Sequence, residues 1–188
     1  MSYCAAVRQG STAACHVEYH DTEYGFPASS DVVLFERLIL EINQAGLSWT
    51  TILNKRQGFR LAYAGFDLAT VAAFNDEDCA RLMADPGIIR NRLKINAAIV
   101  NANAALRLIE EFGSLQGWLD AQHPLTPEGW AKVFKKNFVF TGGEIIREFL
   151  LSTGYISGAH DEDCPVYRKI LKLKPRWKQT TVSRELRQ

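Results

Sequence analysis

No part of this 188-residue chain limits its possible folds as strongly as the stretch from Leu34 to Trp49. Leu34, Leu38 and Ala45 recur at helical spacing, which predicts a helix with an apolar stripe. At about 100° per residue, Glu41 falls in the middle of that stripe. An unpaired carboxylate on a core-facing stripe destabilises a fold by several kcal/mol. Glu41 therefore either pairs with a buried cation or lines a pocket that receives a ligand.

The ends and the opposite side of this helix give further predictions. Gly46 is a C-terminal stop signal, and it leaves Trp49 just beyond the helix. The side opposite the apolar stripe carries polar residues that we expect to face water, namely Glu36, Arg37, Asn43 and Gln44.

Helical signals dominate the rest of the chain. With 47% hydrophobic and 23% charged residues, the composition is typical of one substantial folded domain. Strand-like alternation is scarce, and residues 138–140 are the best candidate for a strand. The predicted class is therefore all-α. Helices are predicted at 68–74 after the cap Asp67, at 76–83 after the cap Asn75, at 88–112, from Thr126-Pro127 onward, and at 143–153.

Charge is distributed unevenly along the chain. Residues 165–188 contain eight Lys or Arg and one Glu, a net charge of +7, whereas the whole chain has a net charge of +1. Such a segment is either a solvated, frayed terminus or a contact for a polyanion such as DNA. A basic segment alone favours neither reading.

The four cysteines are predicted to be unpaired. The first residues lack the apolar run of a signal peptide, and no stretch approaches the roughly 18 apolar residues of a membrane span. We therefore expect a cytoplasmic protein whose cysteines are thiols or metal ligands. One set of side chains contains the four ligands of a tetrahedral zinc site, although buried thiols and surface histidines would also account for it: Cys4, His20, His160 and Cys164.

A short connection at residues 85–87 separates the predicted helices at 77–83 and 88–112. Its Asp-Pro-Gly sequence suits any αα-hairpin turn. It also suits a helix-hairpin-helix motif, in which backbone N–H groups of the turn hold a DNA phosphate without reading sequence. Spacing alone leaves both readings open. Under the second reading, the residues that contact DNA are Gly87, Arg90, Arg92 and Lys94.

Five blocks of the sequence together resemble one known family. They are LFERLILEINQAGLSW followed by TTILNKR at 34–56, YHDTEYGFP at 19–27, GIIRNRLKI at 87–95, FVFTG at 138–142, and the terminal cysteine–histidine set. In order and spacing these blocks are similar to the DNA-3-methyladenine glycosylase I (Tag) family. The resemblance covers about residues 4–167, nearly the whole domain.

The resemblance implies a helix-hairpin-helix DNA glycosylase-like helical bundle with a zinc site that joins the N- and C-terminal segments. Residues 1–167 would form a single compact unit, and 168–188 a basic tail. Within the unit, the helix-hairpin-helix part would span about 45–140, and about 1–30 and 141–167 would bind zinc. Because Cys4, His20, His160 and Cys164 match the family's zinc positions and leave none open for water, the Zn²⁺ would be structural.

The implied activity is hydrolysis of the N-glycosidic bond of alkylated purines, chiefly 3-methyladenine, by base flipping in base excision repair. Glu41 would be the catalytic acceptor for the cationic base, Tyr19 and Trp49 would stack on it, and Tyr24 would complete the pocket. The chain has neither a lysine positioned as a Schiff-base nucleophile nor an activating Asp in a recognisable motif, which indicates a monofunctional enzyme. The implied partner is double-stranded DNA with alkylated bases, bound by a monomer without membrane association.

The sequence also departs from the family pattern. Ala6 stands where an aromatic is usual, Tyr24 where Trp is usual, and Ile42-Asn43 where Gly-Gln is usual. The glycine that normally precedes the FVFTG-like block is missing after Asn137. Ala6 and Tyr24 predict a roomier or less aromatic pocket. These changes leave open a second hypothesis, a zinc-stabilised DNA-binding module of the same fold with altered or lost activity.

Overall fold

The computed structural model describes residues 1–28 and 30–179. Within these ranges the regular structure is helical and contains no strand, so the predicted all-α class is confirmed and the strand predicted at 138–140 is wrong. No helix in these ranges has the length and apolar character needed to cross a membrane. The helices are α1 (Tyr3–Arg8), α2 (Ala14–Thr22), α3 (Asp31–Gln44), α4 (Trp49–Ala62), α5 (Leu68–Ala72), α6 (Asp76–Ala84), α7 (Arg92–Phe112), α8 (Leu115–Gln122), α9 (Pro127–Asn137), α10 (Gly143–Ser152) and α11 (Pro165–Lys172), with 3-10 turns η1 (Ala64–Phe66) and η2 (Arg176–Lys178).

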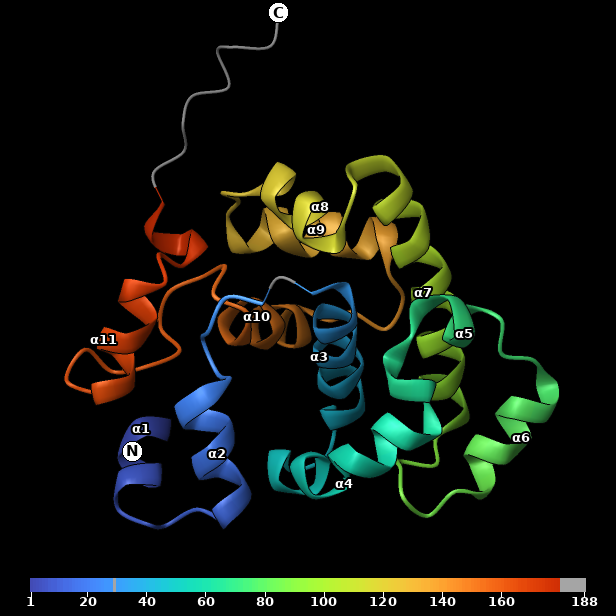
Figure 1. The fold of residues 1–188 in the computed structure, drawn as a ribbon, viewed down its shortest axis with the longest axis horizontal. Coiled ribbons are helices and arrows are strands. Elements are labelled where there is room, and N and C mark those ends of the chain that lie inside the picture. Colours follow the sequence, from blue (N-terminus) through green and yellow to red (C-terminus); the bar gives the residue numbers. More distant parts are fainter. Residues whose placement is uncertain (29, 180–188) are drawn as a thin grey trace, which may run out of the picture.

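Helix α3 lies at the centre of the molecule, where it contacts α4, α7, α8 and α10 (Figure 1). Every residue from 34 to 43 is buried. The prediction that Glu36, Arg37 and Asn43 face water is therefore wrong, and Gln44 is half-buried. The reason is that α3 is covered on several sides, so a single apolar stripe does not describe its environment.

Two buried charged groups of α3, Glu36 and Arg37, are paired by other elements. Glu36 accepts hydrogen bonds from Arg56 at 2.9 Å and from Arg60 at 2.7 Å. Burial alone would raise the pKa of Glu36, but these two guanidinium groups offset it and hold the pKa below the ordinary value. Arg37 donates to the carbonyl oxygens of Glu23 and Ser152, which ties α3 to α2 and α10.

Capping residues set several helix boundaries as predicted. Asp67 accepts from the backbone N–H of Thr70, and Asn75 forms a capping box with Asp78. Thr126 caps α9, with proline at its first position. Helix α7 begins at Arg92, later than the predicted residue 88. Helix α4 was not predicted, although Ser48 is a sequence signal for its N-cap.

The N-terminal helices α1 and α2 lie beside α11 and the segment that leads into it (Figure 1). The chain stays folded after α11. The ring of Trp177 stacks on that of Tyr167 with centroids 6.2 Å apart, and the backbone N–H of Trp177 donates to the Gly154 carbonyl. The basic tail predicted from residue 168 therefore starts inside α11. Residues 180–188 of that predicted tail lie outside the described residues.

Candidate functional site

A cavity of about 430 Å³ opens between α1, α2, α3, α4 and α10. It contains all four residues that the sequence assigned to a pocket, from three separate parts of the chain. Its lining residues are Tyr3, His16, Tyr19, Tyr24, Glu41, Gln44, Trp49, Glu144 and Glu148.

Glu41 is the buried acid of this cavity. Its exposed fraction is 5%, and among residues 1–28 and 30–179 it has no hydrogen-bond or ion-pair partner, in contrast to Glu36 on the same helix. Burial, with a smaller contribution from the Glu148 carboxylate, raises the pKa of Glu41 to about 8. Of the two readings left open by the sequence, the structure thus supports the pocket reading. A desolvated carboxylate without a partner is a site for a cationic hydrogen-bond donor.

Aromatic rings form the walls around Glu41. Tyr19 lies between Trp49 and Tyr24, with ring centroids 5.2 Å and 5.7 Å away. The indole Nε1 of Trp49 is buried and has no hydrogen-bond partner within the described part of the chain. Tyr24 donates its hydroxyl to Glu148 at 3.2 Å, which fixes the ring at the cavity wall. These rings offer π-faces to a flat cationic ligand.

Several lining residues were not predicted from the sequence. Glu144 and Glu148 are one helical turn apart on α10, so their spacing was the signal for a shared face. Burial raises the pKa of Glu148, which places a second acid with a raised pKa beside Glu41. His16 contacts Tyr3 at 3.1 Å and Thr50 at 2.8 Å, and it stays outside the cysteine–histidine set.

The N-terminal departure from the family pattern has a smaller effect on the cavity than the sequence suggested. Ala6 does not line the cavity. Tyr3 does, from the same helix, and its ring meets Tyr24 edge-on with centroids 5.4 Å apart. The prediction of a less aromatic pocket caused by Ala6 is therefore not supported by this geometry.

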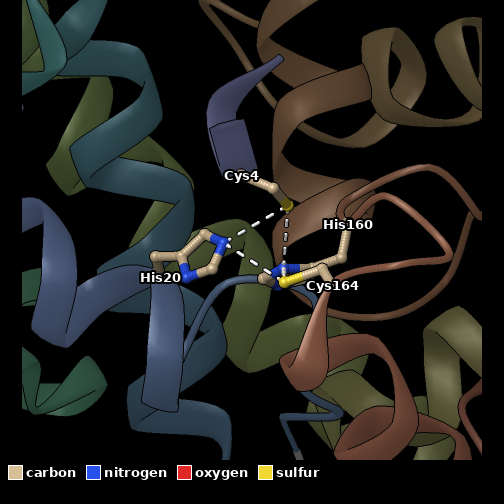
Figure 2. A group of neighbouring side chains, drawn as sticks. All are labelled: Cys4, His20, His160 and Cys164. Atoms are coloured by element: carbon tan, nitrogen blue, oxygen red, sulfur yellow. Dashed lines mark hydrogen bonds between the residues drawn. The ribbon is translucent and has the colours of Figure 1, made fainter. Parts of the chain in front are cut away.

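A second centre joins the two ends of the chain. The ligand atoms of four buried residues lie within 4.8 Å of one another, and their side chains point toward a common position (Figure 2). They come from α1, α2 and the loop that precedes α11, and they are Cys4, His20, His160 and Cys164. This group can hold a metal ion.

The geometry of this centre fits a tetrahedral ion. Cys4 Sγ lies 3.3 Å from His20 Nε2 and 3.4 Å from His160 Nδ1, and Cys164 Sγ lies 3.8 Å from both nitrogens. Zinc bonds of about 2.3 Å to sulfur and about 2.0 Å to nitrogen require roughly 3.6 Å between such atoms. The other ring nitrogens are hydrogen bonded, His20 Nδ1 to Asp21 Oδ1 and His160 Nε2 to the Tyr24 carbonyl, both at 2.7 Å. Such partners orient metal-binding imidazoles.

The turn between α6 and α7 packs closely against α4. Lys55 of α4 donates to the Pro86 carbonyl at 2.6 Å, and a Cβ atom on Gly58 would lie 2.4 Å from the Gly87 carbonyl oxygen. The N–H of Gly87 donates to the Asp85 carboxylate at 2.7 Å. Gly87 was predicted to offer a free N–H to phosphate, and in this structure that donor is already occupied.

The basic residues that follow the turn have different environments. Arg90 and Arg92 are exposed, as a phosphate contact requires. Lys94 is 5% exposed, and its ammonium donates to the carbonyl oxygens of Asn43 and Ala45 at 2.8 Å and 2.7 Å. The prediction of Lys94 as a DNA contact is therefore wrong. Its charge stabilises the C-terminal end of α3, where carbonyl groups have no helical partner.

Comparisons with known proteins agree with this geometry. Residues 9–130 match the family model described as methyladenine glycosylase. DNA-3-methyladenine glycosylase 1 of Escherichia coli (strain K12) is 48% identical over 93 residues, and this match covers 50% of each chain. DNA-3-methyladenine glycosylase of Haemophilus influenzae is 34% identical over 170 residues, and this match covers 80% of the present chain and 91% of that protein.

A solved structure shows the same fold. The solved protein is 3-methyladenine DNA glycosylase I (TAG) from Staphylococcus aureus, whose structure describes how that enzyme recognises 3-methyladenine. The TM-score is 0.79 at 28% identity, and the match covers 88% of this chain and 97% of that one. The all-helical fold that carries this chain's acidic, aromatic cavity is thus the fold of a DNA glycosylase. The chain belongs to the methyladenine glycosylase family.

Proposed function

We propose that this protein is a DNA-3-methyladenine glycosylase, which removes the alkylated base from double-stranded DNA in base excision repair. The observation that carries the proposal is the buried, unpartnered carboxylate of Glu41 inside an aromatic cavity. Membership of the methyladenine glycosylase family supports it. A cavity of about 430 Å³ is within the range of sites for small ligands.

Recognition rests on charge and on ring faces. A purine alkylated at N3 and still attached to its sugar carries a positive charge. The Glu41 carboxylate accepts a hydrogen bond from that base. The base stacks on the ring faces of Tyr19 and Trp49, and its positive charge strengthens this stacking. Glu148 adds negative potential to the same cavity. Unmodified bases are neutral and gain less from this field.

The chemical step needs little further assistance. The positive charge already weakens the glycosidic bond, so the base leaves readily once it is extruded and water attacks the sugar. Glu41 holds the charged base in the position from which it departs, and the buried aromatic walls exclude bulk water from it. Asp120 is the only aspartate between Ile95 and Phe140, and no recognisable motif surrounds it. It accepts a hydrogen bond from the Tyr155 hydroxyl at 2.7 Å and does not line the cavity. We accordingly propose a monofunctional enzyme.

Extrusion of a nucleotide leaves a gap in the duplex. Leu47 is exposed on the turn between α3 and α4, and this turn connects two residues of the cavity, Gln44 and Trp49. An apolar side chain inserted between base steps stabilises an unstacked duplex. We propose Leu47 for that role.

We further propose that the cysteine–histidine centre holds a structural Zn²⁺. Two thiolates and two imidazoles complete the tetrahedral coordination that closed zinc sites favour. The ion would connect α1 and α2 to α11 and thereby hold Tyr3 and Tyr24 at the cavity. The reduced cysteines that such a site needs agree with a cytoplasmic location for a DNA repair enzyme.

The test of the proposed activity is release of base from methylated double-stranded DNA. Products separated by chromatography should include free 3-methyladenine when the wild-type protein is present, above the release in a protein-free control. Intact DNA backbone after the reaction is expected for a monofunctional enzyme. Bound DNA without any released base would support the DNA-binding module instead.

The pH dependence of base release should report on Glu41. Because a carboxylate with a raised pKa is protonated below that value, kcat/KM is expected to fall tenfold per pH unit below about pH 8 and to level off above it. Initial rates at constant ionic strength measure this profile, with protein-free depurination subtracted at each pH. A profile that is flat from about pH 6 to about pH 9 would show that the rate does not depend on the ionisation of Glu41.

Arg90 and Arg92 are the proposed phosphate contacts. Replacing both by alanine should weaken binding to duplex DNA of any sequence and reduce the slope of log K against log salt concentration by about two. Fluorescence anisotropy at several salt concentrations gives this slope. Arg107→Ala, an exposed arginine farther along α7, is the matched control and should leave the slope unchanged.

A further inference from the structure

Two phenylalanines of this chain adopt left-handed backbone conformations, which are unfavourable for any residue with a Cβ atom. Phe66 has φ 62° and Phe140 has φ 60°. Phe66 is fully buried and stacks on Tyr63 with ring centroids 5.7 Å apart, so core packing offsets its strain. Phe140 is 41% exposed and contributes to neither hydrophobic core. Within the described part of the chain, core packing therefore does not offset the strain at Phe140 as it does at Phe66.

The segment that carries Phe140 is held firmly. It connects α9 to α10 and runs beside α7 (Figure 1). Asn101 of α7, which is fully buried, donates to the carbonyl of Val139 at 3.1 Å and accepts from its N–H at 2.8 Å. Both backbone groups before Phe140 are thus satisfied by one side chain. The backbone next to the exposed ring is therefore held in place.

This segment also leads directly to the cavity. Phe140 precedes Glu144 by four residues, and Glu144 lines the cavity while its side chain is largely exposed. Glu144 therefore lies at the cavity mouth. A base that enters through this mouth stays attached to its strand, so the DNA must pass over the rim. Val139 and Phe140 are exposed apolar residues that precede Glu144 by five and four positions in the chain.

We propose that Phe140 is a DNA-contacting residue whose ring packs against a base next to the extruded nucleotide. The inference rests on the proposed glycosylase function and deepens it. Aromatic rings stack on bases of any sequence, and removal of one such ring weakens binding about tenfold. The contact would also offset the backbone strain, which would explain why an exposed phenylalanine occupies a position that suits glycine.

The experiment compares Phe140→Gly with the wild type in three measurements. Because glycine adopts φ 60° without strain, the melting temperature should not fall. Affinity for a duplex that contains an abasic-site analogue should weaken about tenfold. Affinity for free 3-methyladenine, followed by tryptophan fluorescence, should stay within about twofold of the wild type, because the cavity is untouched. Phe140→Tyr should restore DNA affinity, since it keeps a ring.

The control is Leu61→Ala, which removes an exposed apolar side chain from α4 and should leave DNA affinity unchanged. DNA affinity equal to the wild type in Phe140→Gly would overturn the proposal. So would parallel losses for DNA and for the free base, because these would indicate a damaged cavity. Failure of the wild type to release base would overturn the proposed function alone, since the comparison of DNA affinities would still decide the role of Phe140.

Discussion

Glu41→Gln is expected to lower kcat/KM for release of 3-methyladenine from DNA by a factor on the order of 100 to 1,000, the usual effect of removing one preorganised electrostatic partner. The amide keeps the shape of the side chain but has no charge to offer the cationic base. Chromatography of released base under single-turnover conditions measures the loss. The control Glu110→Gln makes the same chemical change at an exposed position of α7 and should leave the rate unchanged.

The same substitution should stabilise the protein in the absence of DNA. The native state keeps a proton on Glu41 up to about pH 8, whereas the unfolded chain releases it near the ordinary glutamate pKa of 4.5. The free energy of unfolding of the wild type therefore decreases as pH rises between these two values. At pH 8, Glu41→Gln should unfold with a free energy higher by about 4 kcal/mol. Urea unfolding at about pH 5 and about pH 8 tests this.

Lower activity together with higher stability distinguishes a ligand-binding acid from a structural one. If Glu41→Gln released base at the wild-type rate, Glu41 would have no part in the reaction. If it instead destabilised the protein at pH 8, Glu41 would have a structural partner, contrary to its lack of hydrogen bonds within the described residues.

Under the proposed zinc site, Cys164→Ala is expected to abolish metal binding and to lower the melting temperature by about 10 °C, because metal binding free energy is part of the folding free energy. Cys164 is buried and is also the residue that precedes α11. Loss of the ion should loosen α11 and the N-terminal helices. Metal content by mass spectrometry and thermal unfolding measure the two effects in one preparation.

Cys15→Ala is the matched control, since Cys15 lies outside the four-residue centre. It should keep the metal content and the melting temperature of the wild type. A Cys164→Ala protein with one zinc ion per chain would show that Cys164 is not a ligand. Loss of metal with an unchanged melting temperature would show that the ion does not stabilise the fold.

Local signals explain which parts of the fold were predictable. A cap depends on a few neighbouring residues, so Asp67, Asn75 and Thr126 set helix starts that a sequence can show. The position of Glu41 on an apolar stripe follows from helical rotation alone. Resemblance of spaced blocks then gave the aromatic pocket residues and the metal set, which the structure brings together in space.

Long-range contacts explain the errors. The sequence predicted that Arg37 and Asn43 face water, but neighbouring helices cover α3 and bury both residues. It predicted Lys94 as a DNA contact, but the Lys94 ammonium binds the carbonyl groups at the end of α3. Glu144 and Glu148 gave no sign that they share a cavity with Glu41, because that depends on how α10 packs against α3.

The amino-acid sequence was sufficient for the helical class, the starts of α5, α6, α9 and α10, and the position of Glu41 on an apolar stripe, because these follow from local backbone chemistry and from periodicity. Tertiary structure alone decided which polar side chains of α3 are paired and that Glu41 has no hydrogen-bond partner among residues 1–28 and 30–179. It also decided that Lys94 serves the fold and that Phe140 is exposed in a strained conformation. The physical reason is that burial and pairing depend on groups distant in the sequence, which meet only after the helices have packed.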